Sequence, residues 1–167
     1  MSDPATPISS TVSSAPPAAG ASPVQVRAQA AIARASARTG VDFSYLLAQA
    51  RIESGLDPQA EARTSSASGL FQFIDQTWLS TLDRHGAALG LGNLAEAIDV
   101  SGGRARVSDP ATREAILDLR FDPDVASLMA GALAGDNAAA LTPALGRAPD
   151  AAELYLAHFL GAEGASQ

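Results

Sequence analysis

The chain has 167 residues, a formal net charge of −7 at neutral pH, two histidines and no cysteine. A chain of this length can bury the core of one ordinary domain. Without cysteine it forms no disulfide and no thiolate metal site, and its acidic balance, with single scattered arginines and no lysine, argues against a nucleic-acid surface. We therefore expect no metal ion, no cofactor and no nucleic acid, and no apolar run is long enough to predict a transmembrane segment.

Residues 1–22 differ in composition from the rest of the chain. They contain four prolines among serine, threonine, alanine and glycine, and Asp3 is their only charge. Because such a segment cannot bury a core, we predict a disordered tail over residues 1–22 and a folded domain over residues 23–167. The start has neither the basic region nor the apolar stretch of a secretory signal, so no signal peptide is predicted.

Two helices are predicted next, the first over residues 23–38 and closed by Gly40, the second over residues 43–54. The second carries an apolar stripe at the i, i+3, i+4, i+7 spacing, made by Phe43, Leu46, Leu47 and Ala50. Glu53 falls on this stripe, where the pattern calls for an apolar residue. Gly55 and Pro58 then end the helix.

The position of Glu53 predicts a raised pKa. A carboxylate that faces an apolar interior loses hydration in its charged form, and the negative end of the helix dipole disfavours the charge further. A glutamic acid that keeps its proton near neutral pH can serve as a general acid. The alternative is that Glu53 is an ordinary solvated acid whose charge interacts with the nearby charges of Arg51 and Glu61.

A polar run over residues 63–68 leads into Gly69, Leu70, Phe71, Gln72, Phe73 and Ile74. The apolar residues indicate a small hairpin or an irregular β element, in which Gln72 points away from Phe71 and Phe73. Asp75 is expected to cap a helix that runs to Gly86, with Trp78 in the core. After a stretch of loops, short extended pieces are predicted to end at Val100 and Val107.

The rest of the chain is predicted to be helical. Asp109 and Asp122, each followed by proline, and Asp150, with Glu153 three residues later, are helix caps and not catalytic acids. The last helix is expected over residues 151–160, with Gly161 as its end. On it Tyr155 and His158 are i, i+3 neighbours, and each could equally be a packing residue. The fold class is thus predominantly α.

The Glu53-Ser54 pair at a helix end, followed by Gly69-Leu70-x-Gln72 and the aromatic Phe73, resembles the soluble lytic transglycosylases, lysozyme-like enzymes that cut peptidoglycan glycan strands. The late run from Tyr155 to Gly161 resembles the phage tail and endolysin branch. The resemblance implies an α+β lysozyme-like fold, catalytic Glu53 with Tyr155 beside it, and His158 as a wall of the sugar groove. It also implies that Gln72 binds an N-acetyl group of the substrate.

Three further residues are candidates for substrate binding, each with an alternative. The Ser65 and Ser66 hydroxyls could bond sugar groups or only satisfy their own turn. Phe73 could stack on a sugar face or pack in the core.

The resemblance implies a one-acid reaction. Glu53 would protonate the glycosidic oxygen and then take the proton of the muramic acid C6 hydroxyl, which leaves a 1,6-anhydro end. A two-carboxylate glycosidase needs a second acid, and the candidates Asp57, Glu61 and Asp75 each have a turn, loop or capping position instead. A hydrolytic muramidase and a non-catalytic wall-binding module of the same fold are the alternatives. We expect a monomer that acts on glycan strands in the periplasm or cell wall, with secretion, flagellar or phage machinery as possible partners and the export route open.

Overall fold

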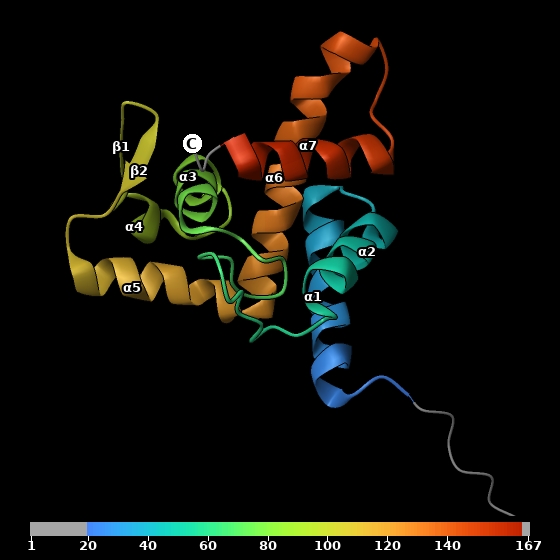
Figure 1. The fold of residues 1–167 in the computed structure, drawn as a ribbon, viewed down its shortest axis with the longest axis horizontal. Helices are drawn as coiled ribbons and strands as arrows, with labels where there is room; N and C mark the ends of the chain where they lie inside the picture. Colours follow the sequence, from blue (N-terminus) through green and yellow to red (C-terminus); the bar gives the residue numbers. More distant parts are fainter. Residues whose placement is uncertain (1–19, 165–167) are drawn as a thin grey trace, which may run out of the picture.

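The structure, a computed structural model, describes residues 20–164, most of which lie in helices (Figure 1). Polar side chains cap several of these helices. Ser22 and Gln25 form a capping box at the first helix, and the Asp42 carboxylate accepts a hydrogen bond from the Tyr45 amide at the second. Asp109 and Asp122 cap two later helices, and Asp150 and Glu153 bond each other's amides at the last. The predicted caps Asp109, Asp122 and Asp150 are therefore confirmed, and Asp75 is the exception.

The described residues form seven α-helices, one short 3-10 helix and one pair of strands, which confirms the predominantly helical class. The elements in chain order are α1 Pro23–Thr39, α2 Phe43–Ser54, α3 Asp75–His85, α4 Gly92–Ala95, β1 Asp99–Ser101, β2 Arg104–Arg106, α5 Pro110–Asp118, the 3-10 helix Leu119–Phe121, α6 Pro123–Leu145 and α7 Ala151–Gly164. Strands β1 and β2 pair antiparallel, with Val100 opposite Ala105.

Helix α6 runs through the middle of the fold. In Figure 1, α1 and α2 lie on one side of it, α3, α5 and the β1–β2 pair lie on the other, and α7 crosses it. The largest fully buried side chains include Trp78, Phe71, Ile32, Leu46, Leu70, Ile116 and Met129. Trp78 is in the core as predicted, and its indole N–H donates to the Ile116 carbonyl oxygen at 2.9 Å.

The buried face of α2 is rotated from the predicted stripe. Phe43 is 38% exposed, whereas Tyr45, Leu46, Gln49 and Ala50 are buried. The prediction for Phe43 was wrong because the side of α2 that carries Tyr45 and Gln49 faces α7 across a shared pocket, an arrangement of distant segments that the α2 pattern does not encode.

The segment after α2 forms a β element, but an irregular one. Ser68 bridges both Glu61 and Phe73, and residues 69–72 between the bridges form a tight turn. Leu70 and Phe71 are therefore in a turn and not in an extended strand, although both are fully buried. Gln72 has a left-handed φ of 51° and is half-buried, whereas Phe71 and Phe73 on either side of it are buried.

Asp75 does not cap α3, so this prediction was wrong. The N-cap residue is Ile74, and the Asp75 carboxylate instead accepts hydrogen bonds from Arg113 at 2.9 Å and from Arg120 at 2.8 Å. Its charge is neutralised by arginines from α5 and the 3-10 helix, which a local sequence pattern cannot show. The prediction that Gly161 ends the last helix was also wrong, since α7 continues through Gly161 to Gly164.

Gly69 is required where the turn meets the 3-10 helix. Its φ is +83°, and a Cβ at this position would overlap the backbone carbonyl of Arg120. We expect Gly69→Ala to lower the free energy of unfolding by about 3 kcal/mol, from the left-handed backbone and the overlap together. Gly40→Ala is the matched control: φ is +76° there and no atom lies within 4 Å of the added Cβ, so it should cost only about 1 kcal/mol. Equal losses in urea denaturation would contradict the overlap.

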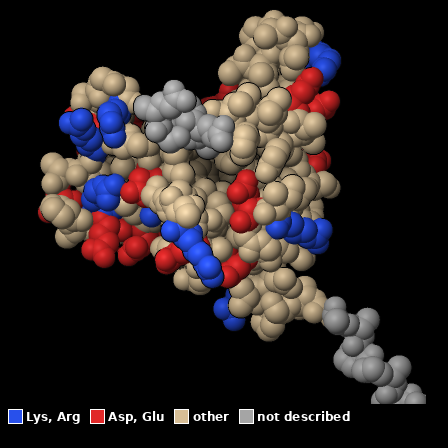
Figure 2. All heavy atoms as spheres, in the orientation of Figure 1, with Lys and Arg blue, Asp and Glu red and all other residues tan. Residues whose placement is uncertain are grey.

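Charges of both signs are interspersed over the face shown in Figure 2. None of the helices in residues 20–164 combines the length and the apolar character needed to cross a membrane. The predicted tail falls mainly on residues 1–19, which lie outside the described residues.

Candidate active site

The end of α2 places Glu53 against the turn of residues 69–72. Gly55 has the left-handed conformation of a helix C-cap, and its amide donates to the Ala50 and Arg51 carbonyls. The Ser54 hydroxyl lies 2.7 Å from the Leu70 carbonyl oxygen, so it can donate a hydrogen bond that joins the helix end to the turn. The Glu53-Ser54 pair therefore has a structural role, because Ser54 holds the turn next to Glu53.

The Glu53 carboxyl group is partly withdrawn from water, with 23% of its side chain exposed. Burial raises its pKa above the ordinary value, and hydrogen bonding from Tyr155 opposes this rise without cancelling it. The direction is the one predicted from the sequence. A carboxyl group in this setting holds its proton to a higher pH than a solvated glutamate does.

Helix α7 brings Tyr155 and His158 to Glu53. His158 Nε2 lies 4.0 Å from Glu53 Oε1, and the pKa of His158 is lowered by burial. The pKa of Tyr155 is raised, first by burial and then by the Glu53 charge. At neutral pH the imidazole is thus uncharged and the phenol keeps its proton, so neither neighbour supplies a positive charge that would strip the proton from Glu53.

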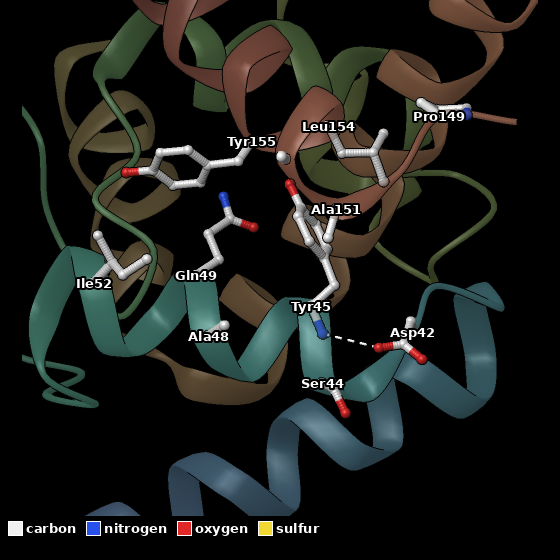
Figure 3. A pocket seen from close by; sticks show the side chains of 11 residues that line it. Asp42, Ser44, Tyr45, Ala48, Gln49, Ile52, Pro149, Ala151, Leu154 and Tyr155 are labelled. Carbon is white, nitrogen blue, oxygen red and sulfur yellow. Dashed lines mark hydrogen bonds between the residues drawn. The ribbon is translucent and has the colours of Figure 1, made fainter.

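Two residues on α2 belong to the same cluster and escaped sequence reasoning. The Tyr45 side chain is buried, and its pKa is raised to about 12 by burial, by Tyr155 and by Glu53. Gln49 is 3% exposed, and Figure 3 shows its amide between the rings of Tyr45 and Tyr155. The signal available in the sequence was spacing: Tyr45, Gln49 and Glu53 follow one another at intervals of four residues, on one face of the helix.

A pocket of about 580 Å³ opens between α2 and α7 beside this cluster (Figure 3). Its wall consists of Asp42, Ser44, Tyr45, Ala48, Gln49, Ile52, Pro149, Ala151, Ala152, Leu154 and Tyr155. Tyr155 belongs both to this wall and to the surroundings of Glu53. The pocket therefore adjoins the acid and does not contain it.

The predicted binding residues of the loop are held largely by internal hydrogen bonds. Gln72 Nε2 donates to the Gly69 and Ala60 carbonyl oxygens at 2.9 and 3.1 Å. The Ser65 hydroxyl accepts from the Ala67 amide and the Ser66 hydroxyl accepts from the Asp75 amide. Both serines are exposed, so their hydroxyls can still reach a ligand, and Gln72 can offer only its carbonyl oxygen without breaking the turn.

Phe73 does not lie on a surface that a sugar could reach. It is 2% exposed, and its ring packs edge-on against Trp78 with centroids 5.0 Å apart. Of the two alternatives for Phe73, the structure favours core packing. Phe73 directly follows the turn of residues 69–72, and its backbone is paired with that of Ser68.

No group of three or more potential metal ligands occurs among the described residues. The chemistry that the cluster offers is proton transfer by one carboxyl group with two uncharged polar neighbours.

Replacing Tyr155 by phenylalanine should move the pH dependence of activity. Hydrogen bonding from Tyr155 lowers the pKa of Glu53, so its removal should raise that pKa further. Activity that needs protonated Glu53 falls as the pH rises through this pKa. In Tyr155→Phe the alkaline limb of the pH profile of kcat/KM should therefore shift to higher pH. Tyr45→Phe is the control: it removes no hydrogen bond to Glu53, so the limb should stay in place. A limb that moves to lower pH in Tyr155→Phe would contradict this arrangement.

Residues 30–94 match the family model of the Transglycosylase SLT domain. The matched segment contains Glu53, the Ser54 contact to the turn, and Gln72, whereas Tyr155 and His158 lie beyond it. The mostly helical architecture with one small sheet is consistent with the lysozyme-like fold of that domain. The match supports cleavage of peptidoglycan by a transglycosylase-type activity, and it does not distinguish the phage branch. Over residues 30–94 the chain is thus similar to the lytic transglycosylase family.

Proposed function

We propose that this protein cleaves the bond between N-acetylmuramic acid and N-acetylglucosamine in peptidoglycan and leaves 1,6-anhydro ends, with Glu53 as the only acid and base. The observation that carries the proposal is the setting of Glu53: a partly buried carboxyl group with a raised pKa, flanked by Tyr155 and uncharged His158.

In the first step, protonated Glu53 gives its proton to the glycosidic oxygen, and the bond from that oxygen to C1 of the muramic acid breaks. The substrate's own N-acetyl oxygen shares the positive charge at C1. In the second step, ionised Glu53 takes the proton of the C6 hydroxyl as O6 bonds to C1. Glu53 is then protonated again, and no water is consumed. Tyr155 can donate to the carboxylate between the two steps.

The surroundings of the other acids support a one-acid reaction. Asp75 is held by Arg113 and Arg120, and the Asp57 carboxylate accepts the Gln59 amide in its own turn. Glu61 is exposed beside the bridge to Ser68. An acid that activates water must face the sugar from the side opposite the general acid. These three acids have structural contacts or an open loop position instead.

Digestion of wall sacculi in water enriched in heavy oxygen tests the reaction. We expect muropeptide ends lighter by one water than lysozyme products, with no heavy oxygen at C1. Reducing ends that carry heavy oxygen would overturn the lyase reaction in favour of a hydrolytic muramidase. A failure of the wild-type protein to release any muropeptide would favour a non-catalytic wall-binding module.

The exposed hydroxyls of Ser65 and Ser66 can reach a ligand, and Gln72 can offer its carbonyl oxygen. This supports the three residues as contacts for the glycan strand. Action on the cell wall as a monomer, and association with secretion, flagellar or phage machinery, stay predictions.

A further inference from the structure

The effect of His158 on Glu53 depends on which ring nitrogen carries the proton. Nε2 lies 4.0 Å from Glu53 Oε1, somewhat beyond hydrogen-bond distance. Burial lowers the pKa of His158, so the ring is uncharged at neutral pH. An uncharged imidazole has a single N–H, on either Nε2 or Nδ1, and the group that faces one nitrogen determines the state of the other. The surroundings of Nδ1 therefore bear on the acid.

A small cavity borders His158 where α3, α6 and α7 meet. Its volume is about 100 Å³, and its wall consists of Thr77, Leu133, Asn137, Ala157, His158 and Gly161. This is enough for about three water molecules at the density of the liquid. Glu53 is not part of the wall, so the cavity reaches His158 from a side that the acid does not occupy.

Thr77 and Asn137 bring hydrogen-bond donors to this cavity. The Thr77 backbone carbonyl accepts from the Ser80 and Thr81 hydroxyls, which leaves the Thr77 hydroxyl for the cavity. The Asn137 amide has two N–H donors, and within residues 20–164 its side chain makes no hydrogen bond to another residue. The two side chains can therefore donate to His158 or to ordered water beside it.

The charge of Glu53 decides which form of the imidazole is useful. Between the two steps of the proposed reaction Glu53 is a carboxylate, which can only accept hydrogen bonds. His158 can contact it favourably only with the proton on Nε2, and Nδ1 is then an acceptor that needs a donor. The described wall residues include no carboxylate that would draw the proton to Nδ1, and the nearby Asp136 is bound by Arg84 and His85.

We propose that Thr77 and Asn137 are positioning residues, which donate to His158 Nδ1 directly or through ordered water and so keep the ring proton on Nε2, where it is donated to ionised Glu53. This inference rests on the proposed function and assigns a role to two residues outside the reaction site. The distance of 4.0 Å has to shorten by about 1 Å when substrate binds, as catalytic hydrogen bonds often do.

Nitrogen magnetic resonance of the labelled imidazole tests the contact, because protonated and unprotonated ring nitrogens differ in chemical shift. At a pH above the pKa of Glu53, His158 Nδ1 should be unprotonated in the wild type. Asn137→Asp keeps the shape of the amide but can only accept, so it should make Nδ1 protonated. Asn93→Asp, the same change at an exposed residue outside the cavity, should leave Nδ1 unprotonated. His85, bound to Asp136, is the internal reference.

The kinetic test uses the double variant Thr77→Val/Asn137→Leu, which keeps the branching of both side chains and removes their donors. The contact of His158 with ionised Glu53 acts after substrate has bound. For the release of muropeptides, kcat and kcat/KM should therefore fall together by about tenfold, equivalent to about 1.4 kcal/mol, with KM unchanged. Asn93→Leu is the matched control and should keep both values. A role in folding alone would lower the thermal midpoint without this pattern.

Three results would each overturn the inference: a protonated Nδ1 in the wild type, an unprotonated Nδ1 in Asn137→Asp, or an unchanged kcat in the double variant. The first needs no variant, so it applies even if a substitution prevents folding. Cleavage by the wild type would leave the proposed function intact in all three cases. Failure of the wild type to release muropeptides would instead contradict the proposed function, wherever the ring proton lies.

Discussion

Replacing Glu53 by glutamine should lower the rate of muropeptide release from sacculi by about 10²–10⁴-fold, the usual contribution of a general acid or base. The amide has nearly the shape of the acid but can neither give a proton to the glycosidic oxygen nor take one from the C6 hydroxyl. Release of soluble muropeptides, followed by chromatography, measures the change.

Glu61→Gln is the control for this experiment. Glu61 is an exposed glutamate in the loop after α2, so the same change of charge should leave the rate near that of the wild type. The fold should survive in Glu53→Gln, and its thermal midpoint should stay close to that of the wild type, since the amide has nearly the shape and volume of the acid. A rate close to wild type in Glu53→Gln, or an equal loss in Glu61→Gln, would contradict the assigned role.

Replacing Arg120 by methionine should lower the free energy of unfolding by about 4 kcal/mol, the scale of breaking a buried ion pair. The Arg120 side chain is 9% exposed, and its guanidinium donates to the Ser66, Phe73 and Leu117 carbonyl oxygens as well as to Asp75. These bonds tie both ends of the turn of residues 69–72 to the 3-10 helix. At about 2–4 °C per kcal/mol, the thermal midpoint should fall by about 12 °C.

Arg113→Met separates this role from the charge of Asp75. Arg113 pairs with the same carboxylate, but its side chain is 42% exposed, and among the described residues that side chain makes no other hydrogen bond. An exposed pair contributes at most about 1 kcal/mol, so Arg113→Met should be nearly neutral. Similar losses in the two variants would show that the neutralisation of Asp75, and not the bonds to the loop carbonyls, holds the turn.

The helices could be predicted because their start and end signals are local. Asp42 and Gly55 lie next to the residues they cap, and Pro110 and Pro123 sit in the first turns of the helices they open. The position of Glu53 at the end of such a helix, and hence the direction of its pKa shift, follows from the same short-range pattern.

The rest depends on contacts between distant segments. The sequence around Asp75 is typical of a helix cap, yet its carboxylate binds Arg113 and Arg120, which are about 40 residues further along the chain. Phe73 sits beside a polar residue, yet the ring packs on Trp78 because the turn folds it inward. The depth of Gln49 depends on where α7 crosses α2, and no pattern within either helix fixes that crossing.

The titration of Glu53 tests the central claim most directly. Nuclear magnetic resonance of the labelled side-chain carboxyl, followed against pH in the free protein, gives its pKa, and the pH dependence of kcat/KM gives the pKa that limits activity. We expect a pKa above the ordinary glutamate value, in agreement with the alkaline limb of kcat/KM, and activity that is lost as the pH rises through it. A Glu53 carboxyl that ionises at or below the ordinary value, while activity persists at neutral pH, would contradict the assignment of Glu53 as the general acid.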